Sequence, residues 1–211
     1  RTQDTLMPYF AKLPDADRVE WICSDMWRPF KKSFRLYLPN AKLVIDKFHV
    51  VRMASVALDT ERKNLQSGMS RYARLNMKKH LRWLLLKRPN FLTEEQLEVL
   101  AQLEKLHPEL KEAYDFKEQF YNIYEATTKN DAIQRFNDWE RDIPKNIKSF
   151  RDVAKTVNNN FEDIFAYWDA PVRITNAYTE GHNGITRVAN RMGRGYTFEV
   201  LRAKMLYHKV A

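Results

Sequence analysis

The sequence predicts a predominantly α-helical protein with a small α/β part near its N-terminus. Two short apolar segments, residues 19–23 and 42–45, each lead into an aspartate and are separated by a stretch with the pattern of a helix. A strand–helix–strand unit of this kind places its two strands in parallel. From residue 50 onwards the apolar residues recur at helical spacing, and no segment has a convincing strand pattern.

The first 45 residues are expected to form the α/β part. Residues 5–13 have a helical pattern, which tolerates Pro8 only if this residue lies in the first turn. Residues 19–23 form the first strand candidate, residues 27–38 a helix, and residues 42–45 the second strand. Both strand assignments rest on short apolar runs, which periodicity alone does not distinguish from buried helix.

The rest of the chain reads as a succession of helices. Residues 47–88 are rich in helix-forming residues, and Ser67-Gly68 is the main interruption. Thr93 with Gln96 three residues later predicts a capping box at the start of the next helix. Further helices are expected at residues 108–126, 131–141, 147–168 with a polar break at 158–160, 175–191 and 198–208.

These patterns divide the chain into three parts. Residues 1–49 form the α/β part, residues 50–170 a large helical block, and residues 171–211 a C-terminal pair of helices. No long Gly/Ser linker and no internal repeat interrupts them. A chain of 211 residues is long enough for one large or two small domains.

Charge is distributed unevenly along the chain, whose net charge is +9. Residues 47–90 hold 11 Lys/Arg against 2 Asp/Glu, residues 94–142 hold 6 against 13, and residues 171–211 hold 7 against 2. Such blocks predict a face that binds a polyanion, although a solvated helical protein with uneven surface charge has the same pattern. The candidates for phosphate contacts in the first basic block are Arg71, Arg74, Lys78, Lys79 and Arg82.

Several classes of protein are excluded by what the sequence lacks. No apolar run approaches the roughly 18 residues that a membrane-spanning helix needs. The single Cys23 excludes an internal disulfide and the zinc sites built from several thiolates. The sequence has no phosphate-binding Gly-rich loop, no dinucleotide fingerprint and no serine nucleophile motif.

Two aspartates follow the predicted strands. Asp25 comes after the first strand and Asp46 after the second, so both are expected at the same edge of the sheet, where α/β proteins bind ligands. Aspartate is also a favoured N-cap residue. The sequence is equally compatible with the interpretation that each aspartate caps the helix that follows it. His49, three residues after Asp46, is compatible with a site residue or with an ordinary half-buried histidine.

A third carboxylate, Glu180, lies on the helix expected at residues 175–191. One side of this helix carries an apolar stripe that is expected to be buried, and Gly181 and Gly184 would allow another backbone to approach. The other side carries a polar row of Asn176, Glu180, Asn183, Arg187, Arg191 and Arg194. A carboxylate that binds a metal ion, followed by arginines that hold phosphates, would have this pattern on that side of the helix. A surface carboxylate in a row of polar residues has the same spacing.

Three motifs together resemble the DDE transposases of bacterial insertion sequences, specifically the ISL-three family. Residues 24–30 (SDMWRPF) resemble the motif of the second aspartate. Residues 38–50 (LPNAKLVIDKFHV) resemble the strand with its D-x-x-H motif, and residues 175–183 (TNAYTEGHN) resemble the glutamate motif. The resemblance implies a partial ribonuclease-H-like core with two parallel strands, interrupted by a large all-helical insertion before the glutamate helix.

The same resemblance implies residue roles and a chemistry. Asp25 would be the second catalytic aspartate and Glu180 the catalytic glutamate, and both would bind Mg²⁺ or Mn²⁺, the ions that carboxylate ligands favour. Asp46 and His49 would support them, together with Asn176 and Asn183. The implied activity is two-metal DNA cleavage and strand transfer at transposon ends, with transposon-end and target DNA as partners. The implied location is the bacterial cytoplasm, in association with the nucleoid and without a membrane.

The chain departs from the family pattern in one respect, because it contains no match for the first aspartate. We therefore expect a fragment that binds the metal weakly and is inactive alone, and that regains Mg²⁺-dependent cleavage with an upstream segment. The strand at residues 19–23 would then have an open edge, and we expect homo-oligomer formation through this edge.

Two functions of other classes stay open on the sequence alone. The first is a non-enzymatic, basic helical module that binds nucleic acid through residues 47–90. The second is a helical interaction or scaffold protein whose acidic and basic blocks pair internally. Binding to DNA that weakens steeply with salt would exclude the scaffold. Convergence of the Asp25 and Glu180 carboxylates within metal-bridging reach would favour the enzyme over the binding module.

Overall fold

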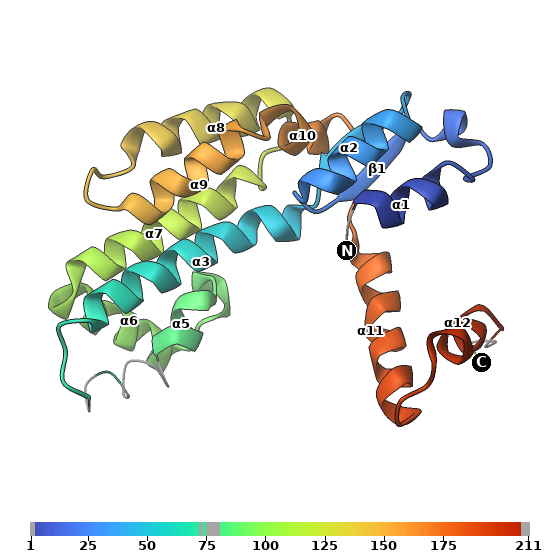
Figure 1. Ribbon diagram of the computed structural model, residues 1–211. Helices are drawn as coiled ribbons and strands as arrows, with labels where there is room; N and C mark the ends of the chain where they lie inside the picture. The colour runs from blue at the N-terminus through green and yellow to red at the C-terminus, as the bar shows by residue number, and fades with distance from the viewer. Residues whose placement is uncertain (1–2, 72–73, 75–80, 208–211) are drawn as a thin grey trace. The chain divides into compact units, whose positions relative to one another are not determined.

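The computed structural model describes residues 3–71, 74 and 81–207. The chain forms two compact units, unit 1 (Arg1–Ile174) and unit 2 (Thr175–Ala211), and each is described by itself. Most of the described residues are helical, and the described strands form one small parallel sheet (Figure 1). The predicted fold class, predominantly α with a small α/β part, is therefore confirmed. The finer division into residues 1–49, 50–170 and 171–211 stays a prediction.

Unit 1 begins with the predicted strand–helix–strand unit. The strands pair in parallel, with Trp21 opposite Lys42 and Ser24 opposite Ile45. The first strand is shifted by one or two residues from the prediction, and the second matches it. The elements of this part are α1 (Gln3–Phe10), β1 (Trp21–Ser24), α2 (Arg28–Tyr37) and β2 (Lys42–Ile45).

The prediction for Pro8 was wrong. Helix α1 begins at Gln3, so Pro8 lies inside the helix and not in its first turn. Proline has no N–H to donate to the carbonyl four residues earlier, which leaves this short helix without one of its bonds. The chain leaves the helix soon afterwards, with a last α-helical bond from the N–H of Ala11 to the carbonyl of Met7 (2.9 Å).

The two strands differ in burial. Leu43, Val44 and Ile45 of β2 are buried, and helix α10 (Phe161–Phe165) and the short helix η4 (Ala166–Trp168) pack against this strand. Most of β1 is only half-buried, and among the described residues β2 is the sole strand that pairs with it. Strand β1 therefore has an open edge in the described structure, and the predicted self-association through that edge stays a prediction.

The helical block matches its predicted helices closely. The capping box is present, because Thr93 and Gln96 each accept a bond from the other residue's backbone N–H. The polar break at residues 158–160 separates two helices as predicted. None of the described helices is both long and apolar enough to span a membrane. The elements are α3 (Lys47–Gln66), α5 (Arg82–Leu86), η3 (Pro89–Phe91), α6 (Glu94–Leu106), α7 (Pro108–Ile123), α8 (Lys129–Asp142) and α9 (Lys148–Asn158), followed by α10 and η4.

Aromatic side chains form the centre of this block. Helix α3 packs along α7 and α9 (Figure 1). The ring of Trp139 contacts the rings of Phe120 (4.8 Å between centroids) and Phe136 (5.9 Å). The indole N–H of Trp139 donates to the carbonyl of Phe116 (3.0 Å), so its polar atom is satisfied inside the core. Each such ring contributes roughly 2–3 kcal/mol when it is fully buried. The block is therefore a rigid support for the sheet that packs on its end.

A buried lysine on α7 links this helix to the end of α5 by hydrogen bonds. The side chain of Lys117 is fully buried, and its ammonium donates to the carbonyls of Leu85 (2.8 Å) and Lys87 (3.1 Å), which end α5. The carboxylate of Glu118 lies 2.7 Å away, and the ring of Tyr114 lies below the ammonium at 4.2 Å. Burial lowers the pKa of Lys117, whereas the hydrogen bond and charge of Glu118 raise it.

Unit 2 consists of α11 (Ala177–Met192) and α12 (Phe198–Tyr207). The apolar stripe of α11 was predicted to be buried, but none of the residues of either helix is buried. Tyr178 and Met192 are 79% and 77% exposed, because two helices alone are too few to enclose a core. A Cβ at Gly181 or Gly184 would meet no atom within 4 Å, so the described structure shows no close backbone approach there.

We predict that Lys117→Met lowers the free energy of unfolding by about 3 kcal/mol, because it leaves Glu118 and the carbonyl of Leu85 without their buried partner. Lys105→Met, at an exposed position on α6, is the matched control and should change it by less than about 0.5 kcal/mol. Urea unfolding followed by circular dichroism measures both. Equal stability of the two variants would contradict the anchoring role of Lys117.

Candidate active site

The parallel register places Asp25 and Asp46 side by side. Each follows a residue of the last strand pair, Ser24 and Ile45, and the backbone N–H of Asp46 donates to the carbonyl of Ser24 (2.9 Å). Both carboxylates therefore stand at the carboxyl edge of the sheet, as predicted from the sequence. This is the edge where open α/β sheets bind their ligands.

Each of these aspartates also supports its own loop. Asp25 accepts a hydrogen bond from the backbone N–H of Trp27 (3.0 Å), and Asp46 accepts one from Phe48 (3.1 Å). Asp46 is the N-cap of α3 and is buried, whereas Asp25 is half-buried and stands two residues before the N-cap of α2, Trp27. The capping alternative is therefore correct for Asp46. A carboxylate has several acceptor positions, so this bond leaves Asp25 able to bind a further ligand.

His49 lies in the first turn of α3 beside the same edge. Its backbone N–H donates to the carbonyl of Asp46 (3.0 Å), and its half-buried ring stands edge-on to Phe48 at 5.7 Å. The D-x-x-H spacing thus corresponds to a helix N-terminus, with the aspartate as cap and the histidine one turn later. The predicted supporting role of Asp46 and His49 in catalysis stays a prediction.

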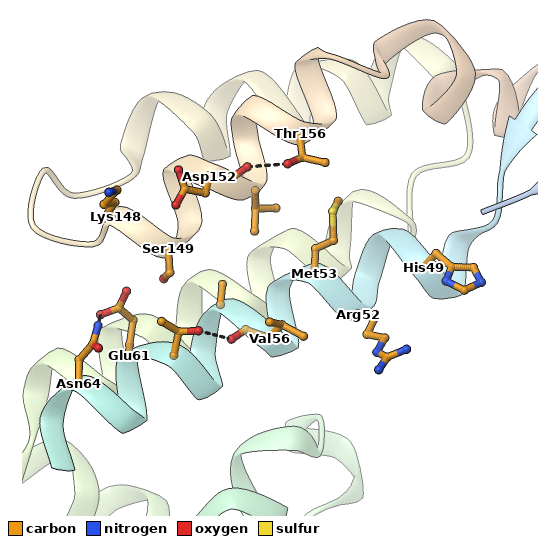
Figure 2. A pocket seen from close by; sticks show the side chains of 13 residues that line it. His49, Arg52, Met53, Val56, Glu61, Asn64, Lys148, Ser149, Asp152 and Thr156 are labelled. Carbon is orange, nitrogen blue, oxygen red and sulfur yellow. Dashed lines mark hydrogen bonds between the residues drawn. The ribbon is translucent and has the colours of Figure 1, made fainter. Parts of the chain in front are cut away.

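A groove of about 580 Å³ runs from His49 between α3 and α9 (Figure 2). Met53 lies along its length, and its rims carry charges of both signs, such as Arg52 and Asp152. Asp25 and Asp46 do not line this groove. Because acidic and basic residues both line it, the groove has no excess of positive charge that would favour an anion, and the carboxylates at the sheet edge remain the better candidate site.

Two further polar groups lie close to Asp46. Burial raises the pKa of the Cys23 thiol to about 12, and the charge of Asp46 contributes to this shift. Burial also raises the pKa of Tyr124, with smaller contributions from Tyr167 and Asp46. Tyr124 follows α7, so the helical block reaches the carboxyl edge of the sheet. Sequence reasoning missed Tyr124, because it reads as one more apolar position of a helix.

Glu180 stands on the other unit. It is exposed in the first turn of α11, and its backbone N–H donates to the carbonyl of Asn176 (2.9 Å), the N-cap. Asn183, Arg187 and Arg191 follow on the same helix at three- and four-residue steps, so the predicted polar row exists over this length. That Asp25 and Glu180 converge stays a prediction, because they belong to different units.

Arg194 does not continue this row. Helix α11 ends at Met192, and Arg194 adopts the left-handed conformation (φ 49°) in the turn to α12. Gly195 follows with φ 97°, a conformation that glycine adopts without strain. The extension of the helical row to Arg194 was therefore wrong.

The basic candidates of the helical block are only partly described. Arg71 and Arg74 are exposed, whereas Lys78 and Lys79 lie outside the described residues. Arg82 is half-exposed and points towards Asp59 (3.7 Å), a carboxylate that it shares with Arg62 and Lys63. Arg82 is therefore partly neutralised, and Arg71 and Arg74 are the more accessible of these arginines.

The donor set at the sheet edge fits a hard cation. Carboxylate oxygens such as those of Asp25 are the ligands that Mg²⁺ and Mn²⁺ prefer. No three His, Cys, Asp or Glu side chains form a potential metal-binding group within residues 3–71, 74 and 81–207. The predicted binding of Mg²⁺ by Asp25 and Glu180 therefore stays a prediction.

Comparison with known proteins gives a consistent result. A family model described as a transposase, of the DDE ISL3 (ISL-three) type, matches residues 1–205. The chain is 26% identical over 202 residues to the transposase for insertion sequence element IS1001 of Bordetella parapertussis, covering 93% of this chain and 49% of that protein. It is also 26% identical over 205 residues to the transposase for IS1557 of two Mycobacterium tuberculosis strains, covering 86% of this chain and 44% of the relative.

The chain thus spans about half the length of the curated relatives it matches. No solved structure matches the chain. All three motifs found in the sequence lie within the matched residues.

The bond from Trp27 to Asp25 leads to a test of structural against chemical roles. Asp25→Ala should lower the free energy of unfolding by about 1 kcal/mol, because the N–H of Trp27 loses its acceptor. Asp25→Asn keeps an acceptor oxygen at the same position and should remain within about 0.5 kcal/mol of the parent. Thermal and urea unfolding measure both values. If the asparagine variant were as unstable as the alanine variant, the contribution of Asp25 to stability would come from its charge and not from this hydrogen bond.

Proposed function

This chain belongs to the ISL3 family of DDE transposases, and we propose that it carries the second aspartate and the glutamate of the active site of a DNA-cleaving and strand-transferring enzyme. The observation that carries the proposal is the family match over residues 1–205, which includes both Asp25 and Glu180. The position of Asp25 at the carboxyl edge of a parallel sheet supports it.

In the proposed reaction Asp25 and Glu180 hold divalent metal ions. When bound, a pair of such ions stabilises the attacking and leaving oxygens of a phosphodiester displacement. The hydrogen bond from the N–H of Trp27 already orients the side chain of Asp25. Metal binding would therefore cost little conformational entropy at this side chain. Asp46 has a positioning role, because it starts α3 and so fixes the loop beside Asp25.

We further propose that the strands and the glutamate helix are parts of a ribonuclease-H-like core. The exposed apolar stripe of α11, with Ile185 (54% exposed), Val188 (48%) and Met192, is a surface that requires a partner. Glu180 lies on the opposite side of α11 from this stripe, so its carboxylate stays available for the proposed active site when the stripe is covered. Asn176 and Asn183, beside Glu180, would then orient the bound phosphodiester.

DNA is the proposed partner of the basic surfaces. Arg187 and Arg191 follow Glu180 on one face of α11 and would hold phosphates next to the metal site. Arg71, Arg74, Lys78, Lys79, Arg82 and Arg194 would add contacts along the duplex. We also propose that the first catalytic aspartate is not among the residues of this chain, that this chain alone does not cut DNA, and that the protein forms an oligomer.

We predict that Asp25→Asn and Glu180→Gln each reduce DNA cleavage below about 1% of the parent, because each removes a metal ligand. The assay uses the complete coding sequence that contains this chain, a duplex with the ends of the insertion sequence, and Mg²⁺. Binding of the same duplex in EDTA should change by less than about threefold. Glu162→Gln, an exposed carboxylate on α10, is the control and should cut as the parent does.

A metal-rescue variant tests direct ligation. Asp25→Cys should cut poorly with Mg²⁺ and recover with Mn²⁺, since Mn²⁺ accepts a thiolate more readily than Mg²⁺ does. Full cleavage by the Asp25→Asn or Glu180→Gln variant would show that the carboxylate is not a catalytic residue. Loss of cleavage without any rescue by Mn²⁺ would place Asp25 outside the metal's ligands.

A further inference from the structure

Three basic residues from distant parts of unit 1 act on the charge of Glu125, a carboxylate that follows α7 and is 56% exposed. The first is Arg88, which follows α5. Its guanidinium lies 2.8 Å from Glu125, 3.2 Å from Glu118 and 2.7 Å from the side-chain oxygen of Asn122. These contacts hold Arg88 along one face of α7.

The second basic residue is Lys47, which follows Asp46 directly in the chain. Its ammonium lies 5.2 Å from the centre of the Tyr124 ring, one residue before Glu125. Lys47 is half-buried, so the charge of its ammonium is less screened than that of a surface lysine. It connects the carboxyl edge of the sheet with the end of α7.

The third is Arg173, which is exposed and precedes Ile174 at the end of unit 1. The carbonyl of Ile174 lies 4.0 Å from the sulfur of Cys23, so this segment passes beside the end of β1. The hydrogen bond from Arg88 holds the pKa of Glu125 below its usual value, and the charges of Lys47 and Arg173 act in the same direction. All three cations thus act on one exposed carboxylate.

Positive charge is in excess at this place. Glu118 is shared between Lys117 (2.7 Å) and Arg88 (3.2 Å), which leaves Glu125 as the exposed carboxylate for the remaining cations. A phosphate diester accepts hydrogen bonds from guanidinium and ammonium groups in the way a carboxylate does. Glu125 therefore stands where an anionic ligand would bind.

We propose that Lys47, Arg88 and Arg173 form a binding site for a backbone phosphate of DNA, and that Glu125 occupies this site until DNA displaces it. The proposal rests on the proposed function to the extent that DNA is the ligand. Because Lys47 follows Asp46, the site lies next to the carboxylates of the sheet edge. A phosphate bound there would join the sheet, the helical block and the segment that leads to α11.

The site is preorganised on the side of Arg88. Lys117 and the hydroxyl of Tyr114 both donate to the carbonyl of Lys87 (each 3.1 Å), the residue before Arg88. The backbone that carries Arg88 is therefore anchored in the core, and its side chain loses little freedom when a phosphate binds. The opposing Glu125 has no comparable anchor beyond Arg88 in the described contacts and is free to turn towards solvent.

The test measures binding of the 211-residue chain to a fluorescent duplex of about 20 base pairs by anisotropy, in EDTA, over a salt series. Lys47→Gln and Arg173→Gln should each weaken binding about fivefold at 0.1 M salt and reduce the slope of log K against log salt by about 1. Glu125→Gln should strengthen binding about fivefold, because the competing carboxylate is gone. Circular dichroism first confirms that each variant is folded as the parent is.

Matched controls separate a site from general electrostatics. Arg141→Gln removes an exposed arginine that is likewise paired with carboxylates (Asp138 at 2.8 Å and Asp142 at 3.1 Å). Glu98→Gln removes an exposed glutamate of α6. Each control should change the affinity by less than about twofold.

The proposal fails if Lys47→Gln and Arg173→Gln match Arg141→Gln, or if Glu125→Gln binds no more tightly than Glu98→Gln. It also fails if the folded chain does not bind DNA at 0.05 M salt. These measurements need neither metal nor cleavage, so they are independent of the tests of Asp25 and Glu180. The binding test can therefore support the phosphate site even if the chain has no catalytic role. It can equally contradict the phosphate site while the catalytic role of Asp25 and Glu180 holds.

Discussion

The parallel pairing of β1 with β2 is the constraint on which the rest of the candidate site depends. Once Ser24 pairs with Ile45, the residues that follow the two strands must lie side by side, and these residues are Asp25 and Asp46. The same pairing fixes the start of α3, because Asp46 is its N-cap. A slip of one residue would turn the side chains of one strand to the opposite face and separate the two carboxylates. The short sheet thus sets both the position of the site and the origin of the helical block.

The helical block gives this small sheet its support. Two strands alone would not be stable in water, but β2 is covered by α10 and η4, which belong to the aromatic core around Trp139. Lys117 extends the same core to α5 by satisfying its last carbonyls. Consequently Arg88, which follows α5, is held relative to Lys47 at the sheet edge. The positions of the residues proposed to bind phosphate are thus set by core packing that is itself distant from the phosphate.

Much of this structure is readable from the sequence where the signals are local. The capping box at Thr93, the break at residues 158–160 and the second strand are all specified by neighbouring residues. Pro8 was misplaced because helix starts without a clear cap are poorly defined by pattern. The cluster around Glu125 was missed for a different reason, since its cations come from three distant segments with no spacing rule. The apolar stripe of α11 was recognised, but its burial depends on a neighbour that periodicity does not identify.

The exposed state of α11 and α12 has an energetic consequence. A helical hairpin that encloses no side chain gains little from the removal of apolar surface from water, and helices of 16 and 10 residues are marginal by themselves. Most of the free energy that keeps them folded must therefore come from whatever surface they eventually cover. The proposed catalytic role of Glu180 would then require such a surface, because a side chain is fixed in space only as firmly as the helix that carries it.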